Sequence, residues 1–247
     1  MDRMLYVAMT GAKNTMLAQA INNNNLANMN TTGFRADLAL FQSLPIDGAG
    51  FPTRVNAVVA GTNVDMSSGP LMATGRELDV AVKGDGLITV QAPDGGDAYT
   101  RAGDLKINSA GMLVTGTGFP VMGNSGPIAI PPYEKLEIGA DGTISILPIG
   151  QSPSTLAVVD RIKLVKAPTD DRMIKTNEGL LRSSKGDSLP VDGSVTLQSG
   201  FIEASNVNGI DALANMIELS RHYEAQVKLL KVAEDNDAAS AQLLRLG

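Results

Sequence analysis

The 247-residue sequence contains no cysteine, no tryptophan and a single histidine, His222. The lack of cysteine excludes disulfides, thiolate ligands for zinc or iron–sulfur clusters, and a thiol nucleophile. A lone histidine has no second ligand and no nucleophile in evident register, so most histidine-dependent catalysis is excluded as well. Much of ordinary enzyme chemistry is therefore outside the reach of this chain.

Long apolar runs and an excess of basic charge are also missing. The longest apolar run near the start covers residues 4–9, which is too short for a cleavable signal peptide. Nowhere do eighteen apolar residues follow one another, so we expect no membrane-spanning segment. The 26 acidic and 20 basic side chains give a net charge of −6 without a basic block, which argues against a nucleic-acid partner.

The motifs that suggest chemistry are weak. Ser183, Ser184 and Lys185 could indicate serine–lysine hydrolysis, but they lie in a polar segment bounded by glycines. Asp79 and the Gly84–Gly86 turn lack the alternating carboxylates and the terminal glutamate of a calcium loop. We therefore expect no catalytic residue, no metal site and no cofactor.

What is present at the N-terminus is a helical pattern. Residues 4–28 contain no proline and one glycine, and small or apolar residues recur at helical spacing. The turn formers of residues 28–33 predict the end of this helix. The apolar stripe is narrow, because residues 22–25 are four consecutive asparagines, whose amides we expect to bond to backbone and neighbouring groups.

The last forty residues predict a longer helix. Asn208 is a plausible N-cap, and Asp211 stands in the first turn, where the helix dipole favours an acidic side chain. Alternate steps of three and four residues from Leu213 follow a coiled-coil-like seam. Its positions are Leu213, Met216, Ser220, Tyr223, Val227, Leu230, Glu234, Asp237, Ala241 and Leu244.

Short strands separated by glycine turns are predicted for the middle of the chain. Residues 78–82 and 87–90 flank Gly84–Gly86 and indicate a hairpin, and residues 93–96 form a further turn. Residues 105–113 and 136–144 share the same offsets, which predicts two similar hairpins in an all-β domain.

The sequence therefore predicts a mainly β, α+β protein whose terminal helices pair as a coiled-coil-like helical domain around a central all-β domain. The expected divisions are an N-terminal helix arm at 1–36, an extended connector with some strand at 37–75, the central β-domain at 76–198, and the C-terminal helix at 199–247. Neither helix can bury its stripe alone. We expect the termini to order fully only in an assembly.

Four motifs in order carry a resemblance to a known family. They are Asn24–Asn28 with Asn30–Arg35, the segment Gly75–Gly86, the segment Tyr99–Gly103, and Ser205–Asn208 continuing through Met216, Ile217, Arg221, Tyr223 and Glu224. Together they resemble the bacterial flagellar rod and hook proteins over nearly the whole chain. The opening residues 1–12 and the short connector after Phe34 are similar to the proximal-rod members of that family.

The resemblance implies a structural subunit of the proximal rod, the periplasmic drive shaft that carries torque from motor to hook. It implies assembly with other rod proteins and with copies of the chain, and export by the flagellar type III apparatus without a cleaved signal peptide. It also implies proximity to peptidoglycan. Two alternatives stay open: a distal-rod paralogue, and a peptidoglycan-binding or peptidoglycan-processing β-domain protein.

The expected assembly interface combines the apolar helix positions with the polar residues at the helix ends. Its members are Leu5, Met9, Ala12, Met16, Asn24, Asn25, Leu26, Asn28, Gly33, Phe34, Asn206, Val207, Leu213, Met216, Ile217, Tyr223, Val227 and Leu230.

Overall fold

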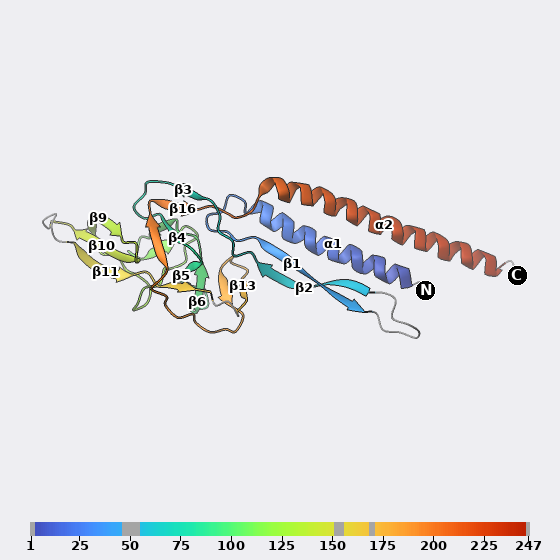
Figure 1. The fold of residues 1–247 in the computed structure, drawn as a ribbon, viewed down its shortest axis with the longest axis horizontal. Coiled ribbons are helices and arrows are strands. Elements are labelled where there is room, and N and C mark those ends of the chain that lie inside the picture. Colours follow the sequence, from blue (N-terminus) through green and yellow to red (C-terminus); the bar gives the residue numbers. More distant parts are fainter. Residues whose placement is uncertain (1–2, 46–54, 151–155, 168–170, 246–247) are drawn as a thin grey trace. The chain divides into compact units, whose positions relative to one another are not determined.

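The computed structural model describes residues 3–45, 55–150, 156–167 and 171–245 (Figure 1). The chain forms two compact units, which interleave along the sequence. Unit 1 consists of Met1–Ala27, Asp37–Asn63 and Asn208–Gly247, and unit 2 consists of Asn28–Ala36 and Val64–Val207. The chain is mainly β with a helix at each end, as the sequence predicts.

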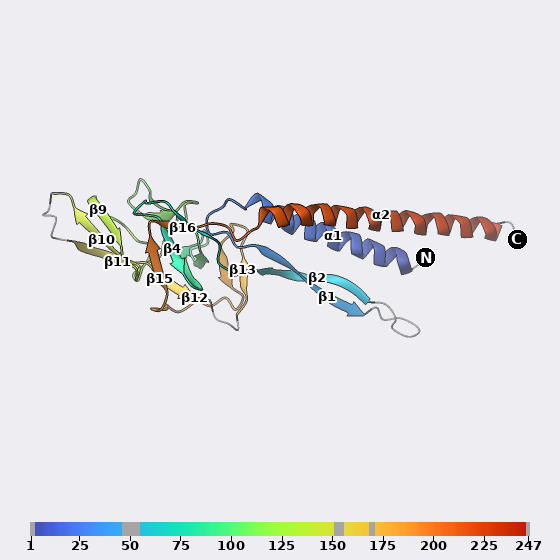
Figure 2. The ribbon, with the colours of Figure 1, turned by 45° about the horizontal axis from the view of Figure 1, so that its top comes forward.

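Unit 1 contains both helices, α1 (Arg3–Ala27) and α2 (Gly209–Arg245), together with β1 (Asp37–Pro45) and most of β2 (Val55–Val64). The helices run antiparallel and side by side (Figures 1 and 2). Strands β1 and β2 pair with each other, and β1 also packs on α1. The segment expected to be a connector thus contributes a two-stranded sheet to the helical unit.

The predicted end of the N-terminal helix and the predicted Asn208 cap are confirmed. Residues 199–207, which the expected division placed with the C-terminal helix, instead contain β16 (Phe201–Glu203) and belong to unit 2. Helix α1 ends at Ala27, and the turn that follows is closed by a hydrogen bond from the Thr31 N–H to the Asn28 carbonyl of 3.1 Å. Asn208 caps α2, because its Oδ1 accepts the Ile210 N–H at 3.0 Å. This bond satisfies one of the backbone donors that a helix start leaves free.

The buried seam of α2 differs from the predicted one. Apart from Gly209 and Ser220, the buried and half-buried side chains of α2 recur in alternate steps of four and three residues: Ala212, Met216, Leu219, Tyr223, Gln226, Leu230 and Ala233. Met216, Tyr223 and Leu230 belong to both seams. Leu213 and Val227, which the sequence assigned to the seam, are 51% and 43% exposed.

Unit 2 holds the remaining strands. They are β3 (Leu71–Ala73), β4 (Val80–Lys83), β5 (Gly86–Gln91), β6 (Asp97–Thr100), β7 (Leu105–Ile107), β8 (Leu113–Thr115), β9 (Tyr133–Ile138), β10 (Thr143–Pro148), β11 (Ala157–Arg161), β12 (Leu164–Lys166), β13 (Met173–Lys175), β14 (Leu181–Ser183), β15 (Thr196–Ser199) and β16 (Phe201–Glu203). The largest sheet has the order β12-β5-β6-β14-β13, and a second has the order β11-β10-β9. Three further pairs are β15-β4, β16-β3 and β7-β8.

The hairpin predictions have mixed outcomes. The β7–β8 and β9–β10 hairpins and the turn between β5 and β6 are confirmed as antiparallel pairs. The predicted β4–β5 hairpin is wrong, although both strands and the turn at Gly84, with φ of 72°, are present. Strand β4 pairs with β15 and β5 pairs with β12 and β6, so the two neighbours in sequence enter different sheets.

A continuous apolar core lies under the strands of unit 2. Side chains of β4, β5, β7, β8, β9 and β10 meet there, with Ile88, Leu105, Leu113 and Ile144 fully buried. A smaller cluster around Leu87 and Tyr99 packs on the other side of β5 and β6. Within the described residues, neither helix has an apolar stretch long enough to cross a membrane.

Candidate functional site

Several large apolar side chains of unit 1 are exposed. Tyr6, Met9 and Met16 of α1 are 53%, 51% and 56% exposed, and Leu213 and Ile217 of α2 are 51% and 57% exposed. The fully buried positions of the helices hold small or polar side chains, which are Ala8, Ala12, Asn14, Ala212 and Ala233. The unit therefore leaves in water the side chains that would gain most from burial.

The exposed apolar side chains of α2 form one stripe. Leu213, Ile217 and Val227 each follow a residue of the buried seam by one position. One position turns the side chain by about 100°, so the stripe lies beside the seam. On α1, Tyr6, Met9 and Met16 are exposed as well. We call these six exposed side chains the apolar face (Tyr6, Met9, Met16, Leu213, Ile217 and Val227).

The predicted interface residues fall into three groups by exposure. Six are exposed: Met9, Met16, Asn24, Leu213, Ile217 and Val227. One, Ala12, is buried in the helix pair. The other eleven are half-buried: Leu5, Asn25, Leu26, Asn28, Gly33, Phe34, Asn206, Val207, Met216, Tyr223 and Leu230.

Several polar members of that set already bond within the chain. The Asn25 side chain makes two 2.8 Å hydrogen bonds to the backbone of Asp37, one as donor and one as acceptor. Asn22, in the same asparagine run, donates to the Ala212 carbonyl at 2.8 Å and so joins α1 to α2. These amides bond to backbone groups, as the sequence predicts.

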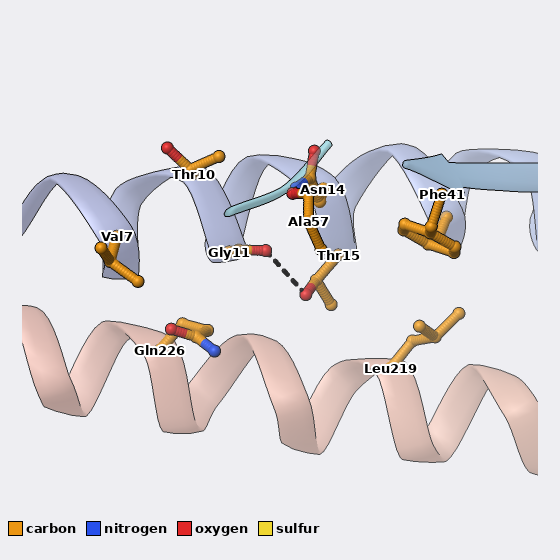
Figure 3. Close-up of a pocket in the computed structure, with 10 residues that line it drawn as sticks. Val7, Thr10, Gly11, Asn14, Thr15, Phe41, Ala57, Leu219 and Gln226 are labelled. Carbon is orange, nitrogen blue, oxygen red and sulfur yellow. Dashed lines mark hydrogen bonds between the residues drawn. The ribbon is translucent and has the colours of Figure 1, made fainter. Parts of the chain in front are cut away.

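A cleft of about 320 Å³ opens between α1, α2 and the strands of unit 1 (Figure 3). Thr10, Asn14 and Thr15 of α1 line it together with Phe41 of β1 and Gln226 of α2. None of its lining residues titrates near neutral pH, so the cleft has no group for acid–base catalysis.

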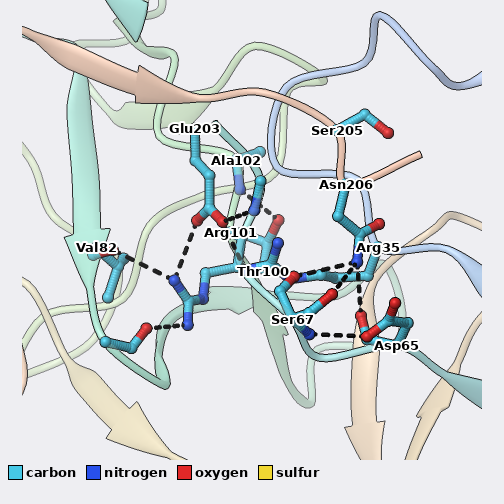
Figure 4. Close-up of polar contacts among 12 residues, drawn as sticks. Arg35, Asp65, Ser67, Val82, Thr100, Arg101, Ala102, Glu203, Ser205 and Asn206 are labelled. Carbon is cyan, nitrogen blue, oxygen red and sulfur yellow. Dashed lines mark hydrogen bonds and ion pairs between the residues drawn. The ribbon is translucent and has the colours of Figure 1, made fainter. Parts of the chain in front are cut away.

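The most deeply buried charges belong to unit 2. Glu203, at the end of β16, lies between two arginines: its carboxylate is 2.8 Å from the Arg35 guanidinium and 3.0 Å from that of Arg101 (Figure 4). All three side chains are at most 1% exposed. The Gly69 N–H also donates to this carboxylate at 2.8 Å. Arg101 thus has Glu203 as its buried carboxylate partner.

Burial shapes the electrostatics of this cluster. Desolvation lowers the pKa of the Arg101 guanidinium, Glu203 acts in the opposite direction, and the charge of Arg35 lowers the pKa further. Arg101 also donates to the backbone carbonyls of Val82 and Gly84. Two guanidinium groups on one carboxylate make a fixed structural contact. Removing one partner from such a contact is costly, because the other charge stays buried.

Asn206, three positions after Glu203, adds further hydrogen bonds to the same cluster. Its Oδ1 accepts the Ala36 N–H at 2.7 Å, and its Nδ2 donates to the carbonyls of Asp65 and Ser67 at 3.1 Å each (Figure 4). Its backbone N–H donates to the Phe34 carbonyl at 3.3 Å. One asparagine thus holds two separate segments of the chain.

Gly33 and Phe34 serve the same contact region. Gly33 adopts φ of 66°, and a Cβ there would lie 2.2 Å from the Arg101 backbone carbon. Its N–H donates to the Glu203 carbonyl at 2.7 Å. The Lys175 ammonium lies over the Phe34 ring, 3.9 Å from the ring centroid, in a cation–π contact. The predicted turn conformation of Gly33 is confirmed, and the close approach of the Arg101 backbone is a second reason for glycine at this position.

The weak catalytic motifs acquire structural explanations. Ser183 and Ser184 both donate to the Asp171 carboxylate, at 2.5 Å and 2.8 Å. These bonds lower the pKa of Asp171. His222 is exposed on α2, 3.8 Å from Glu218 one turn earlier. Among the described residues, no three histidine, aspartate or glutamate side chains gather as metal ligands would.

Sequence reasoning missed Glu203 and the role of Arg35. A signal was present, because Glu203 interrupts an apolar stretch after Phe201 and Ile202. A buried carboxylate requires a partner. Which arginine supplies it depends on tertiary contacts that the sequence does not display.

Comparison with known families matches three parts of the chain. Residues 5–35 match the model described as flagella basal body rod protein, and residues 81–146 match the D1 domain of the flagellar hook protein FlgE/F/G. Residues 198–243 match the C-terminal model of the flagellar basal body rod FlgEFG proteins.

Curated relatives match over the full length. The chain is 39% identical over 252 residues to the flagellar basal-body rod protein FlgF of Salmonella typhimurium, with 100% of both chains covered. The FlgF protein of Escherichia coli gives the same identity and coverage. The flagellar basal-body rod protein FlgG of Bacillus subtilis is 31% identical, with 95% of this chain and 96% of the relative covered.

Proposed function

This chain belongs to the flagellar basal-body rod family, and on that premise we propose that its apolar face is the surface through which it joins the rod. The chain is a structural subunit of the proximal rod, and it is not an enzyme. It assembles with other rod proteins in the flagellar basal body.

One observation carries the proposal: the fully buried positions of the helix pair hold alanine and asparagine, while several large apolar side chains are exposed. Met9, Met16, Leu213 and Ile217 are each more than half exposed, although burial of such a side chain contributes roughly 1.5–3 kcal/mol. A surface of this kind indicates an interaction site. Neighbouring rod subunits are the partners that the family supplies.

We propose further that α1 and α2 pack in a coiled-coil-like manner. The alternation of four and three residues along the buried side of α2 supports this packing. The seam is thin, because Gln226 and alanines occupy positions where a strong coiled coil has leucine. A thin seam makes the helix pair dependent on its neighbours, so full order of the termini is expected on assembly.

The proposal gives the predicted interface residues different roles according to their exposure. The exposed residues Met9, Met16, Leu213, Ile217 and Val227 contact other subunits, and Asn24 borders that surface. The half-buried residues hold the helix pair or the segments beside it. Subunits that meet through two different surfaces form an open helical array, as a rod requires.

The test is the double substitution Leu213→Gln with Ile217→Gln in the full chain. Both side chains are exposed in the single subunit, so its circular dichroism and thermal unfolding should stay within about 0.5 kcal/mol of wild type. Incorporation into basal bodies should fall at least tenfold, and swimming in soft agar should be lost.

Glu218→Gln is the matched control. Glu218 is an exposed residue of the same helix, and its side chain points about 100° away from that of Ile217. It should leave incorporation unchanged. Normal swimming by the Leu213/Ile217 variant would contradict the proposed use of the apolar face.

We propose that the chain reaches the periplasm through the flagellar type III export apparatus without a cleaved signal peptide, and lies near peptidoglycan there. Family membership supports this route. Exported protein should have the mass of the full chain, and export should stop in cells whose flagellar export apparatus is disabled. Co-sedimentation with purified peptidoglycan should be no greater than that of an unrelated acidic protein.

A further inference from the structure

The chain crosses between the two units at four points, and three short segments of unit 2 carry all of them. Segment 28–36 carries the first two crossings, the segment that begins at Val64 carries the third, and the segment that ends at Val207 carries the fourth. A mechanical load passing from one unit to the other through the covalent chain must pass through these three segments.

Glu203 and Asn206 both lie on the segment that ends at Val207. Each of them contacts the other two segments. Glu203 contacts Arg35 at 2.8 Å and accepts the Gly69 N–H at 2.8 Å. Asn206 accepts the Ala36 N–H at 2.7 Å and donates to the Asp65 carbonyl at 3.1 Å. Both residues stand on the third segment, so the three segments are joined twice through side chains.

Backbone bonds close the remaining sides of this arrangement. The Asp65 N–H donates to the Ala36 carbonyl at 2.8 Å, the Gly33 N–H donates to the Glu203 carbonyl at 2.7 Å, and the Ala204 N–H donates to the Pro70 carbonyl at 2.9 Å. Each segment is thus bonded to each of the others. Arg101 then fixes Glu203 to the strands of unit 2 from the opposite side, at 3.0 Å.

We propose that Glu203 and Asn206 act as positioning residues of one cooperative latch. In this latch the segments 33–36, 65–70 and 203–206 open together or not at all. The latch follows from contacts inside unit 2 and does not rest on the rod function. Its consequence is that no single crossing can yield while the others hold.

The test is a double-mutant cycle on the full chain, with Glu203→Gln, Asn206→Ala and both together. Glu203→Gln keeps the shape of the side chain and removes its charge. Independent contacts would give additive losses of stability, because their effects do not share a partner. In a latch, either substitution releases the segments, so the second should add less than half of its single effect.

Amide hydrogen exchange distinguishes a latch from a purely local contact, because loss of a local contact would change the exchange rates of only one segment. In each single variant, exchange should accelerate in all three segments by similar factors, on the order of 100-fold for Glu203→Gln, the usual cost of unpairing a buried charge. Strands β5 and β6 should keep their wild-type protection. Acceleration confined to one segment, or spread evenly through unit 2, would overturn the latch, and so would additive losses.

Two further variants keep the test decisive. Asp94→Asn removes an exposed 2.6 Å ion pair with Arg182 in the same unit, and its effect should add to that of Asn206→Ala. Where Glu203→Gln does not fold, Arg35→Lys replaces it in the cycle, because it keeps a positive charge near the carboxylate. Non-additivity with Asn206→Ala is expected there as well, and additivity would again count against the latch.

Discussion

Gly33 is the most tightly constrained glycine of the contact region in unit 2. Its φ of 66° lies in the left-handed region that favours glycine. The Arg101 backbone also occupies the space that a Cβ would need. A side chain at position 33 is therefore disfavoured for two independent reasons.

Gly33→Ala tests this close approach. The alanine must adopt a left-handed conformation and displace the Arg101 backbone, which lies 2.2 Å from the new Cβ. We expect the free energy of unfolding to fall by more than about 3 kcal/mol in urea denaturation.

Gly95→Ala is the matched control for that substitution. Gly95 has φ of 84° and nothing within 4 Å of a Cβ, so only the left-handed conformation is penalised. The expected loss is about 1–2 kcal/mol. Equal losses in the two variants would show that the contact with Arg101 is unimportant.

Asp104 gives unit 2 an unusual pH dependence. Burial raises the pKa of this carboxyl, the neighbouring Asp79 raises it further, and Lys106 and Arg76 oppose the shift. A raised pKa in the folded state stabilises the protein below the unfolded pKa of 3.8, and this contribution is lost as pH rises through the folded pKa. Asp104→Asn should therefore gain stability relative to wild type between pH 4 and pH 7.

Asp94→Asn should show the opposite sign. A hydrogen bond from Arg182 lowers the pKa of Asp94, so its contribution is present above the unfolded pKa and lost as pH falls. This variant should be less stable than wild type at pH 7, and the difference should shrink on acidification. Urea midpoints at pH 4 and pH 7 decide both cases, and parallel curves for wild type and Asp104→Asn would contradict the first.

At the scale of elements, the sequence predicted more of the helices than of the sheets. Both helices, the Asn208 cap and three hairpin turns were legible because caps, periodicity and glycine turns are local signals. The partner of β4 was not, because β15 lies more than a hundred residues further along the chain. Sheet partners at such separations leave no local pattern.

The predicted α2 seam coincides only in part with the side that meets α1, for a physical reason. The largest apolar side chains, such as Leu213 and Val227, define the strongest periodic stripe, and the prediction followed it. In the single chain, that stripe faces away from α1, and smaller residues such as Ala212 meet the partner helix. A helix that buries two faces carries two overlapping apolar patterns. The sequence does not show which pattern packs against the partner helix and which is left for another surface.

Leu230→Asp tests a position that belongs both to the predicted seam and to the observed buried side of α2. Leu230 is half-buried in the helix pair, so a carboxylate there should cost about 2 kcal/mol or more and lower the helix content of the chain. Unit 2 should keep its fold, and incorporation into the rod should stop. Lys231→Asp, at the exposed neighbouring position, should leave helix content unchanged. Normal motility of the Leu230 variant would count against the seam.

At the scale of the whole molecule, composition narrowed the possible functions and the four motifs indicated the family. The lack of cysteine and the single histidine excluded cysteine-based chemistry and most histidine-dependent catalysis. The sequence did not indicate that the two units interleave along the chain. Segment 28–36 belongs to unit 2 by its contacts, whereas the next segment, 37–63, belongs to unit 1.

Limited proteolysis tests this interleaving. After cleavage within 37–63, the peptide that contains 28–36 should stay bound to the fragment that contains 64–207 during native gel filtration. The bonds of Arg35 to Glu203 and of Ala36 to Asn206 hold it there, in addition to the packing of α1 on α2. In the Glu203→Gln variant the peptide should dissociate more readily. Separation of the wild-type peptide under native conditions would contradict the division into units.

The latch also bears on how fast the chain can fold. Its contacts join residues far apart in sequence, with separations of 170 residues between Ala36 and Asn206 and 102 between Arg101 and Glu203. Contacts of such high sequence separation form slowly, because a long loop must close before they provide any stabilisation. Nearly the whole chain must be available before the last of these contacts can form. The three segments of the latch can therefore become fixed only after the chain has been synthesised as far as Asn206, so the crossings between the units are the last part of unit 2 to be secured.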